Sequence, residues 1–272
     1  MLKTRVISAT VGIAILVAVL LLGRLTFGVA ITVVALIAMY EFYNAVSNTG
    51  LRPVKWLGYL SCILLLGVVF IPSLTVTTEV VFLFAFIVLF ILFFLSIFWH
   101  DRYTINDISI TVLGIAYVAF LFMFVILARN MENGLLMIIF VFLGAYSTDT
   151  FAYFCGMFFG KRKFLPKISP KKTLEGTIGG FLGTILVTIA YGVFVLNAKT
   201  GSSIPVYHYI ILGALIGIIS QLGDWAASSV KRYVNIKDYG NIMPGHGGAL
   251  DRFDSVLFVA PVIYFYFTIV LK

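Results

Sequence analysis

Aspartates inside or beside long apolar stretches are the residues of this sequence best suited to chemistry. Asp149 lies within one apolar stretch, Asp224 near the end of a second, and Asp251 and Asp254 at the start of a third. A carboxylate in apolar surroundings is costly unless it is paired, hydrated or bound to a metal. Asp251 and Asp254 are three residues apart and share a face if they are helical. Carboxylates gathered beside lysines suit Mg²⁺, which prefers oxygen ligands.

Each of these carboxylates also has a structural interpretation. Asp149 stands among serine and threonine hydroxyls, which can hold neighbouring helices together. Farther along, Lys237 with Asp238, and Arg252 with an adjacent aspartate, can form solvated salt bridges. The hydroxyl cluster explains Asp149 poorly, and Asp224 has no charged neighbour in the sequence, so a functional interpretation is favoured for both.

A basic loop follows the stretch that holds Asp149 and Tyr153, and its residues suit a polyphosphate. Hydroxyls and free backbone N–H groups can bond phosphate oxygens while lysines neutralise charge, and the next helix would present its positive N-terminal end. The segment is not a P-loop, because the glycine spacing is one residue short and Arg162 replaces the magnesium-binding Ser or Thr. The alternative is a simple cytoplasmic anchor. The expected phosphate-binding residues are Tyr153, Lys161, Ser169, Lys172 and Thr173.

A second polar segment follows Asp224 and adds further cations. We expect Lys231, Arg232 and Lys237 to bind phosphate groups. His246 lies in a Pro-Gly-His-Gly-Gly turn. It suits a metal ligand or a general base, and equally a structural hydrogen bond, so we leave both interpretations open.

The elements that must position these residues are membrane helices. Hydrophobic residues make up 61% of the 272 positions and charged residues 11%, against about 25% charged in soluble domains. Mean hydropathy is +1.09. The expected fold is therefore an all-α, polytopic integral membrane helix bundle with about nine transmembrane helices. The expected spans are 5–23, 25–46, 56–72, 79–99, 108–128, 134–159, 177–197, 207–230 and 252–271.

The distribution of charge predicts an orientation. With the N-terminus inside, 15 of the 19 Lys and Arg residues fall on the inner side, which favours N-in/C-out with the polar loops facing the cytoplasm. The net charge of +8 also suits polyanionic ligands. Residues 1–130 are nearly featureless and predict a transmembrane scaffold, whereas residues 131–272 hold the unusual polar groups and predict the catalytic region of a single membrane domain.

The second polar segment resembles the signature of the phosphatidate cytidylyltransferase (CDP-diacylglycerol synthase) family. The matching residues are Ser228-Ser-Val-Lys231-Arg232, Lys237-Asp238, Gly240, His246-Gly247-Gly248 and Asp251-Arg252-Phe253-Asp254. Upstream, Asp149 with Ala152-Tyr153, Gly160-Lys161 and Ser169-Pro170 with Lys172-Thr173 also match. One departure is Ala249, where a larger apolar residue is usual. The resemblance covers the chain from Ser147 onward, and the N-terminal half matches only as apolar spans.

The resemblance implies a homodimer with a metal-dependent site that opens to the cytoplasm and to the membrane. We expect the protein in the cell (inner or cytoplasmic) membrane. The resemblance also implies that Asp224 and Asp251 are metal ligands. We expect the metal to be Mg²⁺, with Asp254 and Asp149 as further ligands or as residues that support the ligands, and whether a second cation joins is open. The expected substrates are CTP and phosphatidic acid, with lipids as the surrounding partners and no nucleic acid. The expected catalytic residues are Asp224, Asp251, Lys172, Lys231, Arg232 and His246.

The expected reaction is a direct attack of the lipid phosphate on the α-phosphorus of CTP. Both reactants are anionic, so the protein's task is positioning and charge neutralisation. A CDP-alcohol phosphotransferase is disfavoured because its Asp-Gly-x-x-Ala-Arg motif is absent. An ion-coupled transporter that uses the intramembrane aspartates is the remaining alternative, although no repeat relates the two halves.

Overall fold

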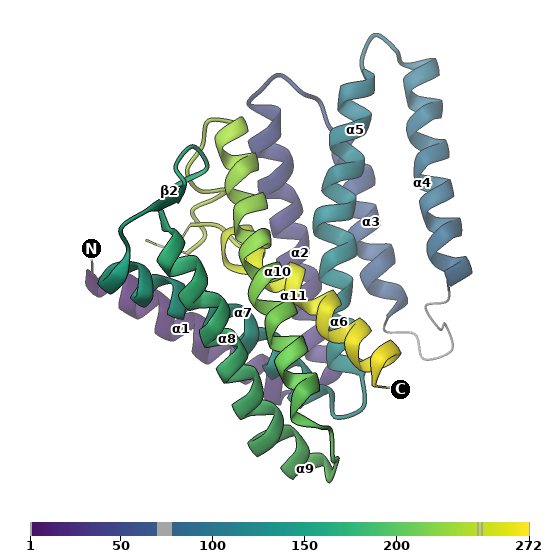
Figure 1. Cartoon of the computed structure of the whole chain (residues 1–272). Helices are drawn as coiled ribbons and strands as arrows, with labels where there is room; N and C mark the ends of the chain where they lie inside the picture. Colours follow the sequence, from purple (N-terminus) through teal and green to yellow (C-terminus); the bar gives the residue numbers. More distant parts are fainter. Residues whose placement is uncertain (1, 70–77, 244, 246, 272) are drawn as a thin grey trace. The chain divides into compact units, whose positions relative to one another are not determined.

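The computed structural model describes residues 2–69, 78–243, 245 and 247–271, and these residues form nine helical segments (Figure 1). Within that part of the chain the only strands are a short hairpin, so the all-α prediction is confirmed. The helices are α1 Leu2–Leu21, α2 Arg24–Ser47, α3 Lys55–Val68, α4 Thr78–Phe98, α5 Ile105–Gly114 with α6 Leu121–Asn130, α7 Gly134–Phe159, α8 Leu174–Tyr191 with α9 Ala198–Thr200, α10 Val206–Tyr233 and α11 Leu250–Phe265.

Three π-helical turns interrupt or extend these helices. Ile115–Phe120 joins α5 to α6, Gly192–Asn197 joins α8 to α9, and Tyr266–Val270 extends α11. Each expected span therefore overlaps one helical segment. The expected end of the third span, near residue 72, lies outside the described residues.

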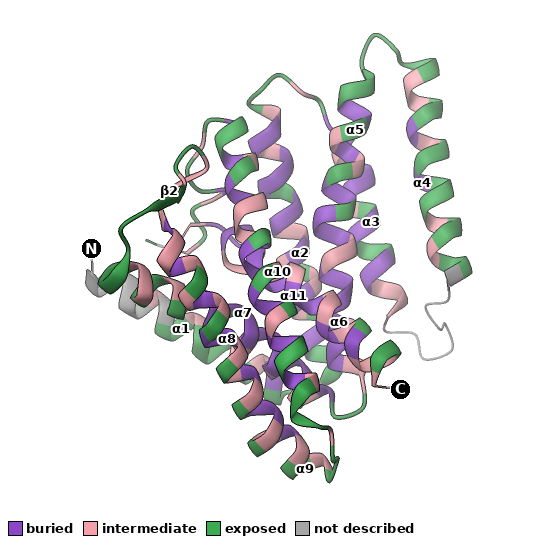
Figure 2. Ribbon diagram, in the orientation of Figure 1, coloured by how far each residue is buried: buried purple, intermediate pink, exposed green. Residues whose placement is uncertain are grey.

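Seven of the described helices are long and apolar enough to cross a membrane. The apolar part of α1, Thr10–Leu21, and α3, Lys55–Val68, are shorter. The chain is thus a multi-pass membrane protein, whereas nine crossings and the N-in/C-out orientation stay predictions. Helix α4 makes the lipid environment plain, because large apolar side chains such as Phe82, Phe86 and Phe90 are exposed along it (Figure 2).

The chain forms two compact units. The first unit comprises residues 1–126 and 234–251, and the second comprises residues 127–233 and 252–272. Each is described by itself below. The division at residue 130 that we expected from the sequence is based on amino-acid composition, whereas these two units are defined by contacts between residues.

Tyr43 of α2 organises the core of the first unit. Its side chain is fully buried and its hydroxyl donates to the carbonyl oxygen of Thr111, at 3.0 Å. Gly58 and Gly114 press on the ring, since a Cβ at either would come within 2.4 Å of ring carbons. Helices α2, α3 and α5 therefore pack around one aromatic side chain.

Small residues bring α7 and α8 of the second unit close together. A Cβ at Gly176 would meet the Ala152 carbonyl oxygen at 2.7 Å, and one at Gly180 would meet the Thr148 carbonyl oxygen at 2.9 Å. The hydroxyls of Thr148 and Thr184 lie 2.7 Å apart across the same interface. Small residues and hydroxyls are the usual means by which helices associate in lipid.

The basic loop after α7 is a β-hairpin, which the sequence analysis did not predict. Strand β1 Lys163–Leu165 pairs antiparallel with β2 Ser169–Thr173. The hairpin leads directly into α8, where the Thr173 hydroxyl accepts a hydrogen bond from the N–H of Gly176 at 3.1 Å. The Glu175 carboxylate accepts the N–H of Lys161 at 3.0 Å, which ties the start of the loop to the same helix end. Lys172 therefore sits on a strand with fixed ends.

Candidate active site

Lys172 and Asp224 form an ion pair in the second unit, and both side chains are about three-quarters buried (26% and 22% exposed). Lys172 comes from β2 and Asp224 from α10. The Lys172 ammonium also lies 5.7 Å from the centre of the Trp225 ring, and Phe164 packs against that ring with centroids 5.3 Å apart. Aromatic packing thus holds the hairpin against the half of α10 that carries Asp224.

Other charged groups of the second unit surround this pair. Asp149 attracts both Lys172 and Arg252, and Asp254 repels Asp149 while attracting Lys231. Asp149 is exposed, whereas Asp254 is buried and its Oδ1 accepts the N–H of Ser255 at 2.8 Å. Carboxylates and cationic side chains therefore lie close together in this part of the second unit. Such a mixture is expected where a metal ion and anionic substrates bind side by side.

Burial and nearby carboxylates act in opposite directions on the Lys172 ammonium. Burial lowers the pKa of its ammonium below the ordinary value; Asp149 and Asp254 oppose this effect, and Lys231 adds to it. A desolvated ammonium gains more from a phosphate oxygen than a hydrated one does. The Nε of Arg252 is buried with no hydrogen-bond partner among the described residues, so this donor is also open to an anion.

The remaining predicted residues of the second unit divide by exposure. Lys231 is buried, and Arg232 is exposed with its Nε donating to the carbonyl oxygen of Ile168 at 3.2 Å, which fixes the hairpin turn on α10. Tyr153 and Lys161 are exposed. The other two, Ser169 and Thr173, lie in β2, and the Thr173 hydroxyl caps α8.

In the first unit, Asp251 binds the backbone of the loop between α10 and α11. This loop, residues 234–249, carries much of the family signature and is called the signature loop below. The Oδ2 of Asp251 accepts the backbone N–H groups of Tyr239 at 2.7 Å and of Gly248 at 3.0 Å. The carboxylate thus closes the loop on itself at the start of α11. Lys237 is exposed in this loop. His246 lies outside the described residues, so its two interpretations stay open.

Glu41 is a site residue that sequence reasoning missed. This carboxylate of α2 is 3% exposed and accepts the N–H groups of Ala249 at 3.0 Å and Leu250 at 2.9 Å, capping α11. A Cβ at Gly240 or Gly248 would come within 2.3 Å of Glu41 Oε1, so the loop needs glycine at both positions. The signal was present, because Glu41 is the one acidic residue in the apolar α2 sequence.

The expected metal ligands were tested against this geometry. In the part of the chain that the structure describes, no three His, Cys, Asp or Glu side chains gather closely enough to hold a metal ion. The donor chemistry of Asp149, Asp224 and Asp254 nevertheless fits a hard cation, since all three offer carboxylate oxygens near one set of cations. The Lys172 ammonium is paired with the Asp224 carboxylate in this structure, so a cation bound by Asp224 would have to displace that ammonium.

Comparisons with known proteins agree with the motifs. A model of the family described as "Cytidylyltransferase family" matches residues 3–270. The chain is 34% identical to the phosphatidate cytidylyltransferase of Bacillus subtilis (strain 168), over 97% of this chain and 96% of that protein. It is 33% identical to the protein of the same name from Staphylococcus haemolyticus (strain JCSC1435), over 96% of this chain and 97% of the relative.

Proposed function

Since the chain belongs to the cytidylyltransferase family, we propose that it joins CTP to phosphatidic acid, forming CDP-diacylglycerol and pyrophosphate. The single observation that carries the proposal at the level of residues is the Lys172–Asp224 pair, set among further carboxylates and cations. Such a cluster suits a reaction between two anions. The protein is on this proposal a membrane-embedded nucleotidyltransferase.

The reaction needs no covalent enzyme intermediate. A phosphate oxygen of phosphatidic acid forms a bond to the α-phosphorus of CTP, while the bond from that phosphorus to the bridging oxygen of the β-phosphate breaks. The leaving pyrophosphate takes the electron pair. The lipid phosphomonoester carries about −1.5 to −2 charges, so the barrier is largely electrostatic repulsion.

Cationic side chains of the second unit lower this repulsion. Lys172 and Lys231 would bind phosphate oxygens from partly desolvated positions, and the unpartnered Nε of Arg252 offers a further donor. Arg232 holds the hairpin turn through Ile168 and adds charge at the surface. Lys161 and Tyr153, both exposed, would act only at the edge of the site.

We propose Asp224, Asp254 and Asp149 of the second unit, with Asp251 at the start of α11, as the residues that would hold Mg²⁺. When bound, Mg²⁺ neutralises the charge on CTP and on the departing pyrophosphate. Asp224 would be available to a metal ion if the Lys172 ammonium paired with a phosphate oxygen instead. Asp251 also serves the fold, because it holds the N–H groups of Tyr239 and Gly248.

Orientation and assembly complete the proposal. A cytoplasmic site is supported by the excess of Lys and Arg on the expected inner side and by the cytoplasmic location of nucleotide pools. Homologues of bacterial origin support a location in the cell membrane. A homodimer rests on the family resemblance alone. The ion-coupled transporter considered above gains no support from the comparisons.

The test is direct. Purified protein in detergent with CTP, phosphatidic acid and Mg²⁺ is expected to release one pyrophosphate for each CDP-diacylglycerol formed. Asp224→Asn, which removes the charge of the central pair, serves as the matched inactive variant. Release of pyrophosphate that does not depend on the lipid, or CDP-diacylglycerol formation by Asp224→Asn at the wild-type rate, would contradict the proposal.

A further inference from the structure

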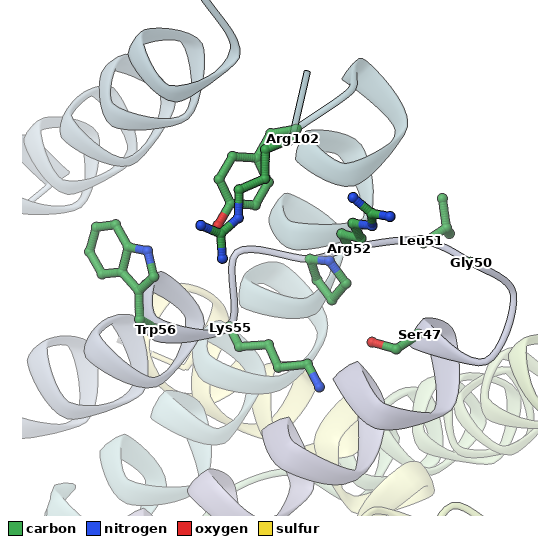
Figure 3. A pocket seen from close by; sticks show the side chains of 9 residues that line it. Ser47, Gly50, Leu51, Arg52, Lys55, Trp56 and Arg102 are labelled. Carbon is green, nitrogen blue, oxygen red and sulfur yellow. The ribbon is translucent and has the colours of Figure 1, made fainter. Parts of the chain in front are cut away.

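A cavity of the first unit is lined by none of the residues assigned to the reaction. It has a volume of about 580 Å³, opens to the surface and is lined by two loops, one between α2 and α3 and the other between α4 and α5 (Figure 3). The first loop and the start of α3 supply Arg52, Lys55 and Trp56, and the second loop supplies Arg102 and Tyr103. Segments far apart in the sequence thus line one hollow.

Three cationic residues, Arg52, Lys55 and Arg102, line this cavity. Figure 3 shows Arg102 reaching toward the segment that carries Arg52 and Lys55. Among the described residues, no salt bridge involves any of the three, and the Lys55 ammonium donates to the neutral side-chain oxygen of Asn44 at 2.7 Å. Two guanidiniums and an ammonium that line one cavity are the groups that bind phosphate oxygens in proteins.

The acidic residues close to these loops do not neutralise the cavity. Asp107 attracts Arg52, but it is buried, and its oxygens accept the N–H groups of Arg52 and Thr104 and the Thr104 hydroxyl. Asp107 therefore fixes the shape of the first loop. Asp101 is exposed and paired with His100 at 3.1 Å. Among the described residues, Lys55 and Arg102 form no salt bridge, so their charges are available to a ligand.

The cavity lies at the ends of apolar helices, and this position indicates which class of ligand it binds. Both loops join apolar helices, since α2 ends at Ser47, α3 begins at Lys55, α4 ends at Phe98 and α5 begins at Ile105. Such ends lie at the level of lipid headgroups. Trp56 is 50% exposed, and Arg102 lies over the Tyr103 ring at 5.4 Å. Aromatic rings beside cations at this depth are typical of contact with lipid headgroups.

We propose that the cavity binds the phosphate of an anionic phospholipid headgroup from the surrounding bilayer. The site is separate from the residues that handle CTP and phosphatidic acid, and binding there does not depend on the proposed reaction. Arg52 and Arg102 bind the phosphate oxygens, Lys55 adds charge, and Trp56 contacts the glycerol region. A lipid held here ties the two loops together at the membrane surface.

The test measures lipid retention on the full-length protein in detergent by native mass spectrometry. Wild-type protein is titrated with phosphatidylglycerol, with phosphatidylcholine, and with inorganic phosphate as a competitor. Phosphatidylglycerol is expected to bind at least about tenfold more tightly than phosphatidylcholine, because a hydrogen bond to a charged group contributes about 1.5–3 kcal/mol and tenfold is about 1.4 kcal/mol. Equal retention of the two lipids, or displacement of phosphatidylglycerol by millimolar phosphate, would overturn the proposal.

Matched variants locate the binding. The double variant Arg52→Gln/Arg102→Gln is expected to lose at least about tenfold in affinity for phosphatidylglycerol. Arg24→Gln/Lys199→Gln removes the same charge outside the cavity and is expected to bind as the wild type does. Lys55→Gln, which leaves both arginines in place, tests the site if the double variant does not fold. Equal losses in the cavity variant and the control variant would show that bulk charge alone attracts the lipid, and the site would be rejected.

Discussion

Glu41 accepts a hydrogen bond from the backbone N–H of Leu250 at 2.9 Å, although 209 positions separate the two residues. The second oxygen of the same carboxylate holds the N–H of Ala249 at 3.0 Å. The first helical turn of α11 has N–H groups without intrahelical partners, and Glu41 accepts one of them, from Leu250, together with the N–H of Ala249 just before the helix. The apolar N-terminal region thus contributes directly to the loop that carries the family signature.

Glu41→Gln is therefore expected to destabilise the protein. The amide oxygen can accept only one of the two N–H groups, and the amide NH₂ faces the other. Leaving a buried donor unpaired costs about 1–3 kcal/mol, so the thermal transition in detergent should fall and cytidylyl transfer with it. Glu79→Gln changes an exposed carboxylate of α4 in the same way and should leave the transition in place. An unchanged transition for Glu41→Gln would show that the cap contributes little.

The helices could be predicted from the sequence because each is encoded by a local apolar run. The contacts that build the site could not, since they join residues with no local signal of their partners. Asp224 has no charged neighbour in the sequence, yet Lys172 of a different element meets it. The hairpin has no clear local signal, because Pro170 lies within β2 and proline is more typical of loops than of strands. Glu41 is visible in the sequence as the one acidic residue of α2, but its role as a cap depends on the folded structure.

Asp224 and Asp251 are expected to respond differently to substitution. Asp224→Asn should lower turnover by several orders of magnitude, because it removes a carboxylate proposed to hold Mg²⁺. Its effect on thermal stability should be small, because Asp149 and Asp254 still attract the Lys172 ammonium that loses its partner. Asp251→Asn should also lower turnover, and its amide oxygen can still accept the N–H groups of Tyr239 and Gly248. Asp251→Ala removes that acceptor and should lower stability by about 1–3 kcal/mol as well.

Turnover against Mg²⁺ concentration, with a thermal transition for each variant, separates these roles. Asp238→Asn is the control, because this residue is exposed in the same loop. Wild-type turnover and metal dependence in Asp224→Asn would remove that residue from the metal site. A stable Asp251→Ala protein would show that the two loop N–H groups find other acceptors.

Lys172→Ala is expected to raise the KM for CTP. A charged hydrogen bond to phosphate contributes about 1.5–3 kcal/mol, which corresponds to about a tenfold increase or more. Lys172→Arg need not restore binding, because the planar guanidinium must replace a compact ammonium packed near Trp225 and paired with Asp224. Lys171→Ala, next to it on β2 and exposed, should change the KM little. Equal effects at both lysines would mean that the hairpin acts by charge alone.

The hairpin and the signature loop are predicted to face the same, cytoplasmic side of the membrane. Both must reach one CTP, and the excess of Lys and Arg on the expected inner side supports the direction. Cys62 and Cys155 are first replaced by alanine, and single cysteines are then placed at Lys167, Lys237 and Lys199. A membrane-impermeant thiol reagent added to intact cells should label only position 199, which the scheme puts outside, and permeabilisation should expose the other two. Labelling of 167 or 237 in intact cells would reverse that part of the topology, and labelling of just one of them would separate two segments that the proposed reaction requires on one side.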